Sequence, residues 1–192
     1  LQGYNAITLM DENGNRELNW TVTITRCEFQ DFRIAFSYYY YNYNRDNDDS
    51  TTTSHTSITL SDCSFRYNEH AIYTRFYSST RFSSSGRNDM SLAVVGNTFT
   101  NHTDHAIDIE QAIGEVEVTI SDNSFQSNAN SVIRMPNTIR YCNVTKNSFW
   151  NNAGRYVINV YEALQTDLVG FYHVIEENSF TTDKSHKSSQ AQ

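Results

Sequence analysis

Six segments of the chain share one pattern of alternating hydrophobic and polar residues. Two inward-type residues, two positions apart, are followed three residues later by Asn or Cys and then, after two more residues, by Phe. The segments are VTITRCEF (22–29), ITLSDCSF (58–65), LAVVGNTF (92–99), VTISDNSF (118–125), CNVTKNSF (142–149) and HVIEENSF (173–180). A period of two residues predicts β-strands with one buried face, so each Phe is expected to point into a core.

A second strand-like piece follows each of the first five segments. These pieces are RIAFSY (33–38), AIYTRF (71–76), AIDIEQ (106–111), VIRM (132–135) and VINVY (157–161). The closing Phe recurs at intervals from 24 residues (Phe125 to Phe149) to 36 residues (Phe29 to Phe65). No helical period separates the strands, which argues against helical and leucine-rich repeats. We therefore predict an all-β right-handed parallel β-helix, a solenoid of about six to seven rungs with long loops on one side.

Equivalent residues of successive rungs should lie one above the other, at the parallel-strand spacing of about 4.8 Å. The six Phe residues would then form one stack. A second, inward column could pair its amides from rung to rung and so avoid the cost of burying an isolated amide. Its members would be Asn97, Asn123, Asn147 and Asn178.

The three cysteines occupy inward positions, which favours buried packing residues. Cys27 and Cys63 hold the Asn position on two successive rungs. Their expected Cα separation is within the range of a disulfide, so the pattern fits a bridge as well as two thiols. Cys142 is left over, either buried or paired with a cysteine outside this chain.

The solenoid is expected to fill residues 1–182 as a single domain, followed by a polar tail at 183–192. The piece YNAITLM (4–10) resembles the second strand of a rung whose first strand is missing. We therefore expect the chain to be a segment of a longer solenoid.

Insertions fall mainly after the second strand, at 37–57, 77–90, 111–115, 136–140 and 162–170. Loops that leave each rung at the same point emerge on one side, which is often the binding face. The first two loops are rich in Tyr and Arg, the residue types enriched at interfaces. We therefore predict that a protein or glycan, or another copy of the chain, binds to Tyr39, Tyr40, Tyr41, Tyr43, Arg45, Tyr77, Arg81, Phe82 and Arg87. The alternative is that the first tyrosines complete a strand or pack beneath the loop.

A catalytic role has one candidate pair of carboxylates. Asp108 and Glu110 should both face outward on one strand, roughly 6.5–7 Å apart, a separation typical of an inverting glycosidase. The expected register places Arg134 beside Asp108 and Arg75 beside Glu110, and stacked opposite charges commonly stabilise sheets. Arg134 as the base of a lyase would need calcium ligands, and no acidic cluster accompanies it. We assign no catalytic residue.

A metal site has a similarly small basis. His70 and His105 each precede the Ala-Ile of their strands, and with Asp104 they could hold an ion. Ordinary surface turn residues explain the same pattern, so the sequence assigns no metal and no cofactor.

Charge and hydropathy limit the partners further. The chain has 14 Lys and Arg against 22 Asp and Glu, a net charge of −8, whereas nucleic-acid binding needs a basic surface. No apolar run of about 18 residues is present, so no membrane span is expected. Sequons begin at Asn19, Asn101 and Asn143, and all three are expected to be exposed, as glycosylation requires.

The pattern V-x-I-x-x-N-x-F, with Ala-Ile some eight residues on, resembles the parallel β-helix repeats of the carbohydrate-binding and sugar-hydrolase superfamily, which includes pectate lyases. The resemblance covers residues 4–180 and specifies function less than fold, because lyases, phage tailspikes and non-enzymatic animal proteins share such repeats. The irregular loops, tyrosines and sequons resemble the extracellular β-helix regions of large animal proteins, such as the insect cell-junction family that includes Bark beetle, also called Anakonda. That resemblance implies a non-catalytic, extracellular scaffold or adhesion role. A polysaccharide-cleaving enzyme and a viral or phage fibre are the alternatives.

Overall fold

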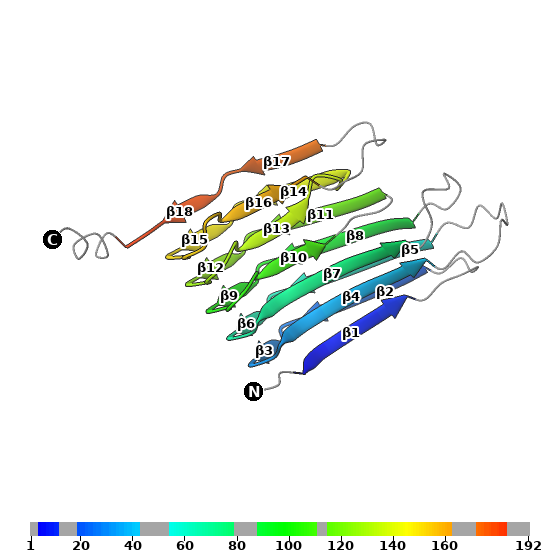
Figure 1. The fold of residues 1–192 in the computed structure, drawn as a ribbon, viewed down its shortest axis with the longest axis horizontal. Helices are drawn as coiled ribbons and strands as arrows, with labels where there is room; N and C mark the ends of the chain where they lie inside the picture. The colour runs from blue at the N-terminus through cyan, green and yellow to red at the C-terminus, as the bar shows by residue number, and fades with distance from the viewer. Residues whose placement is uncertain are drawn as a thin grey trace.

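The computed structural model describes residues 4–11, 19–42, 54–78, 88–110, 115–162 and 172–183. These residues form strands in three parallel sheets and no helix (Figure 1). Within this part of the chain, nothing qualifies as a helix able to cross a membrane. Most of the polar tail expected at 183–192 lies outside the described residues.

Each sheet contains one strand from each of six successive rungs. Sheet B consists of β2 (Asn19–Thr25), β5 (Ser54–Ser61), β8 (Asn88–Val95), β11 (Glu115–Ser121), β14 (Tyr141–Thr145) and β17 (Tyr172–Glu176). Sheet C consists of β3 (Glu28–Gln30), β6 (Ser64–Arg66), β9 (Thr98–Thr100), β12 (Ser124–Gln126), β15 (Ser148–Trp150) and β18 (Ser179–Thr181). Sheet A consists of β1 (Asn5–Asp11), β4 (Ile34–Asn42), β7 (His70–Ser78), β10 (Ile107–Glu110), β13 (Ile133–Pro136) and β16 (Ile158–Tyr161).

The chain passes through sheets B, C and A in turn and then begins the next rung. Every strand pairs in parallel with the equivalent strand of the neighbouring rung, for example Phe29 with Phe65 and Ile72 with Ile107. This is a right-handed parallel β-helix of about six rungs, as the repeat predicted. β1 lies at one edge of sheet A, beside β4, and no strand of sheets B or C precedes it among the described residues.

The predicted Phe column forms inside sheet C. Neighbouring rings stack with centroids 4.7–5.0 Å apart and interplanar angles of 10° or less. Phe65, Phe99 and Phe125 are fully buried. Phe180 stacks on Phe149 but remains 55% exposed, because no described strand covers its other face.

Sheets B and C are joined by a sharp bend, here named the B–C bend. One residue of each bend has a positive φ of 54–69°: Arg26, Asp62, Gly96, Asp122, Lys146 or Glu177. The next residue belongs to the predicted amide column. Asn97 Nδ2 donates to Asn123 Oδ1, Asn123 Nδ2 donates to Asn147 Oδ1, and Asn147 Nδ2 donates to Asn178 Oδ1, at 3.0–3.1 Å.

The Oδ1 atoms of this column also accept backbone N–H groups of the preceding rung, at 2.8–3.0 Å. The donors are Cys63, Asn97, Asn123 and Asn147, and the acceptors are Asn97, Asn123, Asn147 and Asn178, respectively. Each buried amide therefore has both donor and acceptor partners, which offsets the cost of its burial.

A second column, not predicted from the sequence, forms at the C–A bend between sheets C and A. Its side chains accept backbone N–H groups from Phe32, Asn68, His102 and Asn128 in turn, at 2.9–3.2 Å. The acceptors are Asn68, His102, Asn128 and Asn152, each three residues after a column Phe. That spacing is the signal by which the sequence could have revealed the column. It was hidden because the first rung has Phe32 there and the third has His102.

The cysteines differ in part from the prediction. Cys63 and Cys142 are buried, whereas Cys27 is exposed, and all three are free thiols. Cys27 is exposed because β2 and β3 are the edge strands of sheets B and C, so no described rung covers it. Its backbone N–H donates to Cys63 Sγ at 3.4 Å, so the two residues occupy the ladder as predicted, without a bridge.

Candidate functional site: the outer face of sheet A

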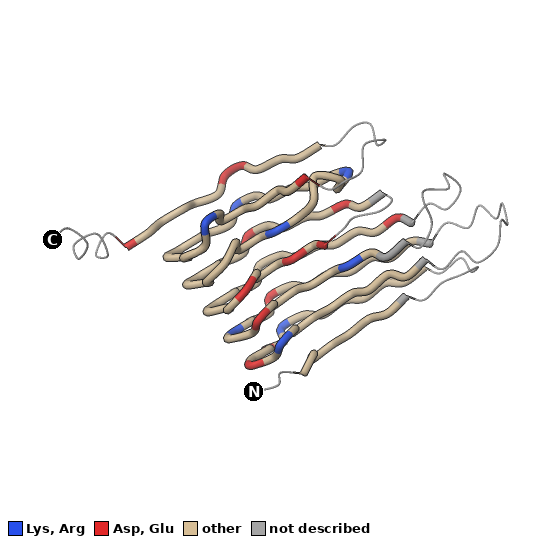
Figure 2. The backbone as a smooth tube through the Cα atoms, viewed as in Figure 1, with Lys and Arg blue, Asp and Glu red and all other residues tan. Residues whose placement is uncertain are grey.

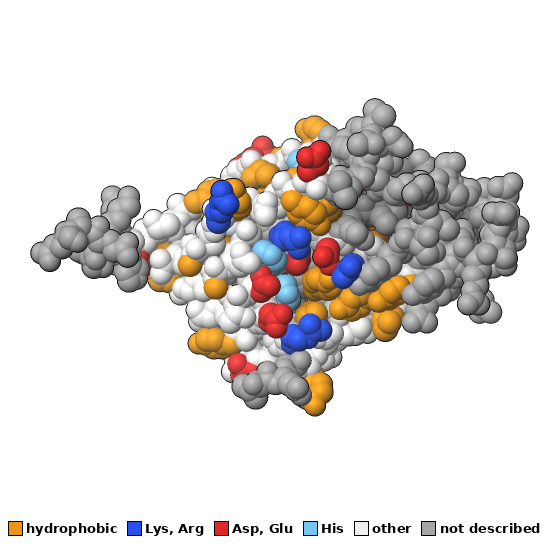
Figure 3. Space-filling view, viewed as in Figure 1, with side chains coloured by type: hydrophobic (Ala, Val, Ile, Leu, Met, Phe, Trp, Pro, Cys, Tyr) orange, Lys and Arg blue, Asp and Glu red, His pale blue; other side chains and the backbone are white. Residues whose placement is uncertain are grey.

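The outer face of sheet A carries the side chains that alternate with the core residues of β4, β7, β10, β13 and β16. Figure 3 shows His and charged side chains gathered in the middle of this face, beside a patch of hydrophobic side chains. Figure 2 shows that acidic and basic residues follow one another from rung to rung. The charge and type of the outward side chains therefore vary from rung to rung, although the backbone repeats.

The two predicted carboxylate–arginine pairs are both present. Asp108 lies opposite Arg134 in the β10–β13 register, and Arg134 Nη1 contacts both oxygens of Asp108 at 3.1 and 3.2 Å. Glu110 lies opposite Arg75 in the β10–β7 register, with Arg75 Nη1 at 3.3 Å from Glu110 Oε2. These pairs are electrostatic contacts between neighbouring rungs.

Asp108 lies on the outer face as expected, but its side chain is buried. Its side chain is 4% exposed, whereas that of Glu110 is 30% exposed. Burial raises the pKa of Asp108, and the neighbouring Arg134 opposes this rise. The alternation predicted the outward direction correctly but not the burial, and Arg134 is in direct contact with the buried carboxylate.

Tyr73 connects the charged pairs to the aromatic residues. Its hydroxyl donates to Glu110 Oε2, and its ring lies 5.6 Å from that of His70. Burial, and next the hydrogen bond to the Glu110 carboxylate, raise the pKa of Tyr73 well above its usual value. The phenol therefore stays protonated as a donor. Tyr73 was not among the site residues predicted from the sequence.

The run of tyrosines divides between the core and the surface. Because β4 extends to Asn42, Tyr38 and Tyr40 point inward and are 1% and 5% exposed, whereas Tyr39 and Tyr41 are half-buried on the outer face. The prediction that the loop begins at residue 37 and that Tyr40 belongs to the binding surface is therefore wrong. The alternative, that the first tyrosines complete the strand, is confirmed.

The outward tyrosines pack against one another. The Tyr39 ring lies 6.3 Å from the Tyr41 ring and 5.8 Å from the Tyr73 ring. On the far side of the ion pairs, the Arg134 guanidinium lies over the Tyr161 ring, with the Arg134 Cζ atom 4.6 Å from the ring centroid. Alternation along β7 and β16 places Tyr73 and Tyr161 outward, a signal that could have identified both.

The other residues predicted for the binding face are not placed. Tyr43, Arg45, Arg81, Phe82 and Arg87 lie outside the described residues, and only the backbone of Tyr77 is described, opposite Tyr41 in the β4–β7 register.

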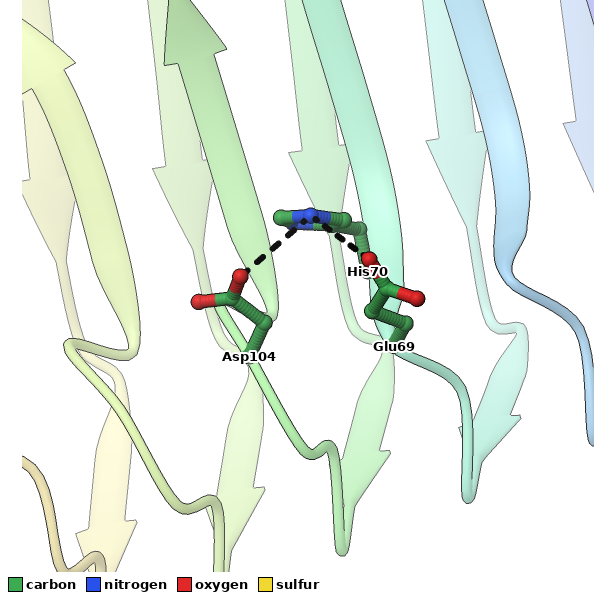
Figure 4. A group of neighbouring side chains, drawn as sticks. All are labelled: Glu69, His70 and Asp104. Carbon is green, nitrogen blue, oxygen red and sulfur yellow. Dashed lines mark ion pairs between the residues drawn. The ribbon is translucent and has the colours of Figure 1, made fainter.

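A second group of side chains lies at the C–A bend, next to this face. Glu69 and His70 come from one rung and Asp104 from the next, and Figure 4 shows both carboxylates directed at the His70 ring. The ligand-type atoms of these three residues lie within 4.8 Å of one another. His105, also predicted as a candidate ligand, faces Asp104, with Nε2 at 3.5 Å from Oδ1.

The three sequon residues differ in accessibility. Asn19 is exposed at the start of β2, whereas Asn101 and Asn143 are half-buried. Asn143 points outward between the buried Cys142 and Val144, as predicted, but its Oδ1 atom is itself buried. Among the three, the Asn19 side chain is therefore the most accessible to a glycosylating enzyme.

Comparisons of the chain with protein-family models, with curated proteins and with solved structures found no match. The fold is therefore assigned from the strand register and the ladders.

Proposed function

We propose that this chain is a non-catalytic extracellular scaffold or adhesion module that binds a protein or glycan partner, as in a cell-junction protein. The binding surface is the outer face of sheet A, centred on Tyr39, Tyr41 and Tyr73. The reason to expect an extracellular location is the resemblance of the repeat to extracellular β-helix regions of animal proteins.

One observation carries the proposal: half-buried tyrosines pack together, and one of them, Tyr73, donates to the Glu110 carboxylate, which an arginine also contacts. Tyrosine offers apolar area and a polar tip at a low cost in side-chain entropy, which suits recognition of sugars and proteins. The strands of a rigid solenoid hold these rings in place before a partner arrives. Such preorganisation lowers the entropic cost of binding.

The charged pairs favour binding over cleavage of a polysaccharide. An inverting glycosidase needs one carboxylic acid and one carboxylate free to activate water. Asp108 receives two contacts from Arg134, and Glu110 contacts both Arg75 and the Tyr73 hydroxyl. Carboxylates engaged in this way are poorly placed to act as general bases, because their oxygens already accept donors from neighbouring side chains.

The proposal is tested with the double variant Tyr39→Ser/Tyr41→Ser. Binding is measured on an array of immobilised extracellular glycans, and self-association is measured by sedimentation. We expect the wild-type chain to bind in one of these assays and the variant to lose that binding, with an unchanged β-sheet circular dichroism spectrum. The matched control is Tyr141→Ser/Tyr172→Ser, which removes another stacked tyrosine pair, with centroids 5.8 Å apart, from sheet B.

Three results would contradict the proposal. The first is equal binding by the wild-type chain and the Tyr39→Ser/Tyr41→Ser variant. The second is loss of binding only in the sheet B control. The third is release of reducing ends or unsaturated sugars from a polysaccharide, abolished by Asp108→Asn, which would favour an enzyme.

The extracellular location has its own test. When the chain is secreted from animal cells, we expect an N-linked glycan on Asn19, detected as a shift in mass that peptide N-glycosidase removes. Asn19→Gln should abolish this shift, and Asn143→Gln should leave it unchanged. Retention of the full shift in Asn19→Gln would contradict the assignment.

A further inference from the structure

We propose that Glu69, His70 and Asp104 bind a divalent transition-metal ion, with Zn²⁺ as the best-suited ion, and that His105 lies beside the site, against Asp104. The inference is independent of the proposed partner binding. It rests on the geometry of two successive rungs, which meet where the Asp104 N–H donates to the Glu69 carbonyl at 3.1 Å. This contact brings two carboxylates and two imidazoles to one side of the C–A bend.

The spacing of the side-chain atoms fits ligands of one ion better than hydrogen-bond partners. His70 Nε2 lies 3.6 Å from Asp104 Oδ2 and 3.8 Å from Glu69 Oε1, both longer than an ordinary hydrogen bond. One imidazole nitrogen carries at most one proton, so it cannot donate to two carboxylates. Two donor atoms that each bind Zn²⁺ at about 2.1 Å in tetrahedral geometry lie about 3.4 Å apart.

Outer hydrogen bonds orient two of the side chains in this group, Asp104 and His105. Asn130 Nδ2 donates to Asp104 Oδ1 at 2.8 Å, which leaves Oδ2 directed at His70. His105 Nδ1 lies 2.7 Å from the Ser131 carbonyl oxygen, which can only accept, so Nδ1 carries the proton. A metal-binding histidine usually makes such a bond through its other nitrogen.

This tautomer gives His105 an unprotonated Nε2 in its neutral form, and that atom faces Asp104 Oδ1 at 3.5 Å. A lone pair and a carboxylate oxygen repel each other unless a cation or a proton lies between them. Two carboxylates meet in this small volume, and a divalent ion would neutralise their charge.

The donor set selects the type of ion. Imidazole nitrogen suits Zn²⁺ and other first-row transition metals, whereas Ca²⁺ and Mg²⁺ prefer sites made only of oxygen. The Asp104 and Glu69 side chains are 37% and 47% exposed, whereas His70 is 12% exposed. The ion can therefore enter from solvent on the carboxylate side while the imidazole stays fixed.

The test uses the full chain carrying Cys27→Ser, because the exposed Cys27 thiol would itself bind Zn²⁺. After treatment with a chelator and dialysis, the protein is titrated with ZnCl₂ in a calorimeter, and its thermal midpoint is recorded with and without Zn²⁺. We expect saturable binding of one ion per chain and a higher midpoint with Zn²⁺. Equal concentrations of CaCl₂ and MgCl₂ should give neither effect.

Four substitutions locate the site. His70→Ala and Asp104→Asn should each abolish binding, and the exposed Glu69→Gln should weaken it with the least risk to folding. Asn130→Ala should weaken binding roughly 10- to 100-fold, as expected for a residue that orients a ligand. The matched control is His55→Ala, since exposed His55 lies opposite Asp89 in the register of sheet B and supplies an imidazole with a carboxylate neighbour elsewhere.

Each result of these titrations either supports the metal site or overturns it. Loss of binding in His70→Ala and weaker binding in Glu69→Gln, with full binding in His55→Ala, support the site. Unchanged binding in His70→Ala and Asp104→Asn overturns it, as does the absence of saturable Zn²⁺ binding in the Cys27→Ser parent. Stronger binding of Ca²⁺ than of Zn²⁺ overturns the assignment to a transition metal.

Discussion

The two bends of each rung use the same backbone geometry but differ in how regularly they are occupied. At the B–C bend a residue with positive φ precedes a column that, after Cys27 and Cys63, contains only Asn. At the C–A bend a residue with positive φ again precedes the column, but here Phe32 and His102 interrupt the Asn residues. In both columns Asn or His side chains accept backbone N–H groups of the preceding rung, at 2.8–3.0 Å at the B–C bend and at 2.9–3.2 Å at the C–A bend.

The difference teaches that the fold requires an acceptor at a fixed place rather than one residue type. Asn Oδ1 and His Nδ1 both reach the N–H of the preceding rung, and the Cys63 sulfur receives the N–H of Cys27. The C–A bend can therefore vary, and it is also the place where Glu69, His70 and Asp104 gather. The C–A column, which accommodates different residue types, therefore lies beside the candidate metal site.

The largest expected effect concerns the Phe column between the two bends. Phe125→Ala should lower the free energy of unfolding by about 3–5 kcal/mol, because a fully buried ring leaves a cavity. Phe180→Ala, at the equivalent position but 55% exposed, should cost much less. Urea unfolding monitored by circular dichroism measures both, and equal losses would mean that burial in the column does not set the energy.

The His102 position should make the C–A bend sensitive to acid. Burial lowers the pKa of His102 to about 4 from its usual 6.5, and Nδ1 accepts the Asn68 N–H, a bond that protonation removes. Because the unfolded chain binds this proton more tightly, stability is present above pH 6.5 and falls as pH decreases toward 4. The total loss should be roughly 3 kcal/mol.

The variant His102→Asn restores the residue type of the neighbouring rungs, and it should remove this part of the acid sensitivity. Urea unfolding at several pH values, in the presence of a chelator, measures the difference between the two proteins. A pH dependence that is identical in wild type and variant would show that His102 is not buried as a neutral acceptor.

Loss of one ladder amide should have an intermediate effect at either bend. Asn123→Ala leaves the Asn97 N–H and the Val94 carbonyl without their side-chain partner, and should cost about 2 kcal/mol. Asn128→Ala removes the equivalent bonds to the His102 N–H and the Phe99 carbonyl. Similar losses by chemical unfolding would confirm that the two bends are energetically equivalent, and a negligible loss at one bend would refute it.

The smallest effect is expected on the outer face. Glu110→Gln breaks the pair with Arg75, whose side chain is 34% exposed, and should change stability by about 1 kcal/mol or less. The change should shrink further in high salt, because salt screens partly exposed pairs. A loss as large as that of Asn123→Ala would show that this face contributes to the fold as strongly as the ladders do.

Some side-chain positions could be predicted from the sequence, and others could not. The Phe and Asn columns were predictable because one residue type recurs at a fixed offset in most rungs. The directions of Tyr38 to Tyr41 were not, since four consecutive identical residues contain no hydrophobic alternation. Only the length of β4 decides that Tyr40 is buried and that Tyr39 is half-buried on the outer face.

In the candidate site, too, some contacts were predictable from the sequence and others were not. The stacked pairs of Asp108 with Arg134 and of Glu110 with Arg75 followed from the alignment of repeats, because register in a solenoid is fixed by its inward columns. The burial of Asp108 and the exposure of Cys27 did not, because both depend on which neighbours cover the position.

The sequence by itself determined the solenoid, its rung order and the direction of most strand residues, because local alternation and the repeat act through nearest neighbours. Only the tertiary structure decided which acceptors form the C–A column and how the carboxylates of Glu69 and Asp104 surround His70. Glu69 and Asp104 are separated along the chain by a whole rung and become neighbours only when one rung stacks on the next. Contacts between rungs depend on loop lengths and side-chain directions that vary along the chain, so no single repeat encodes them.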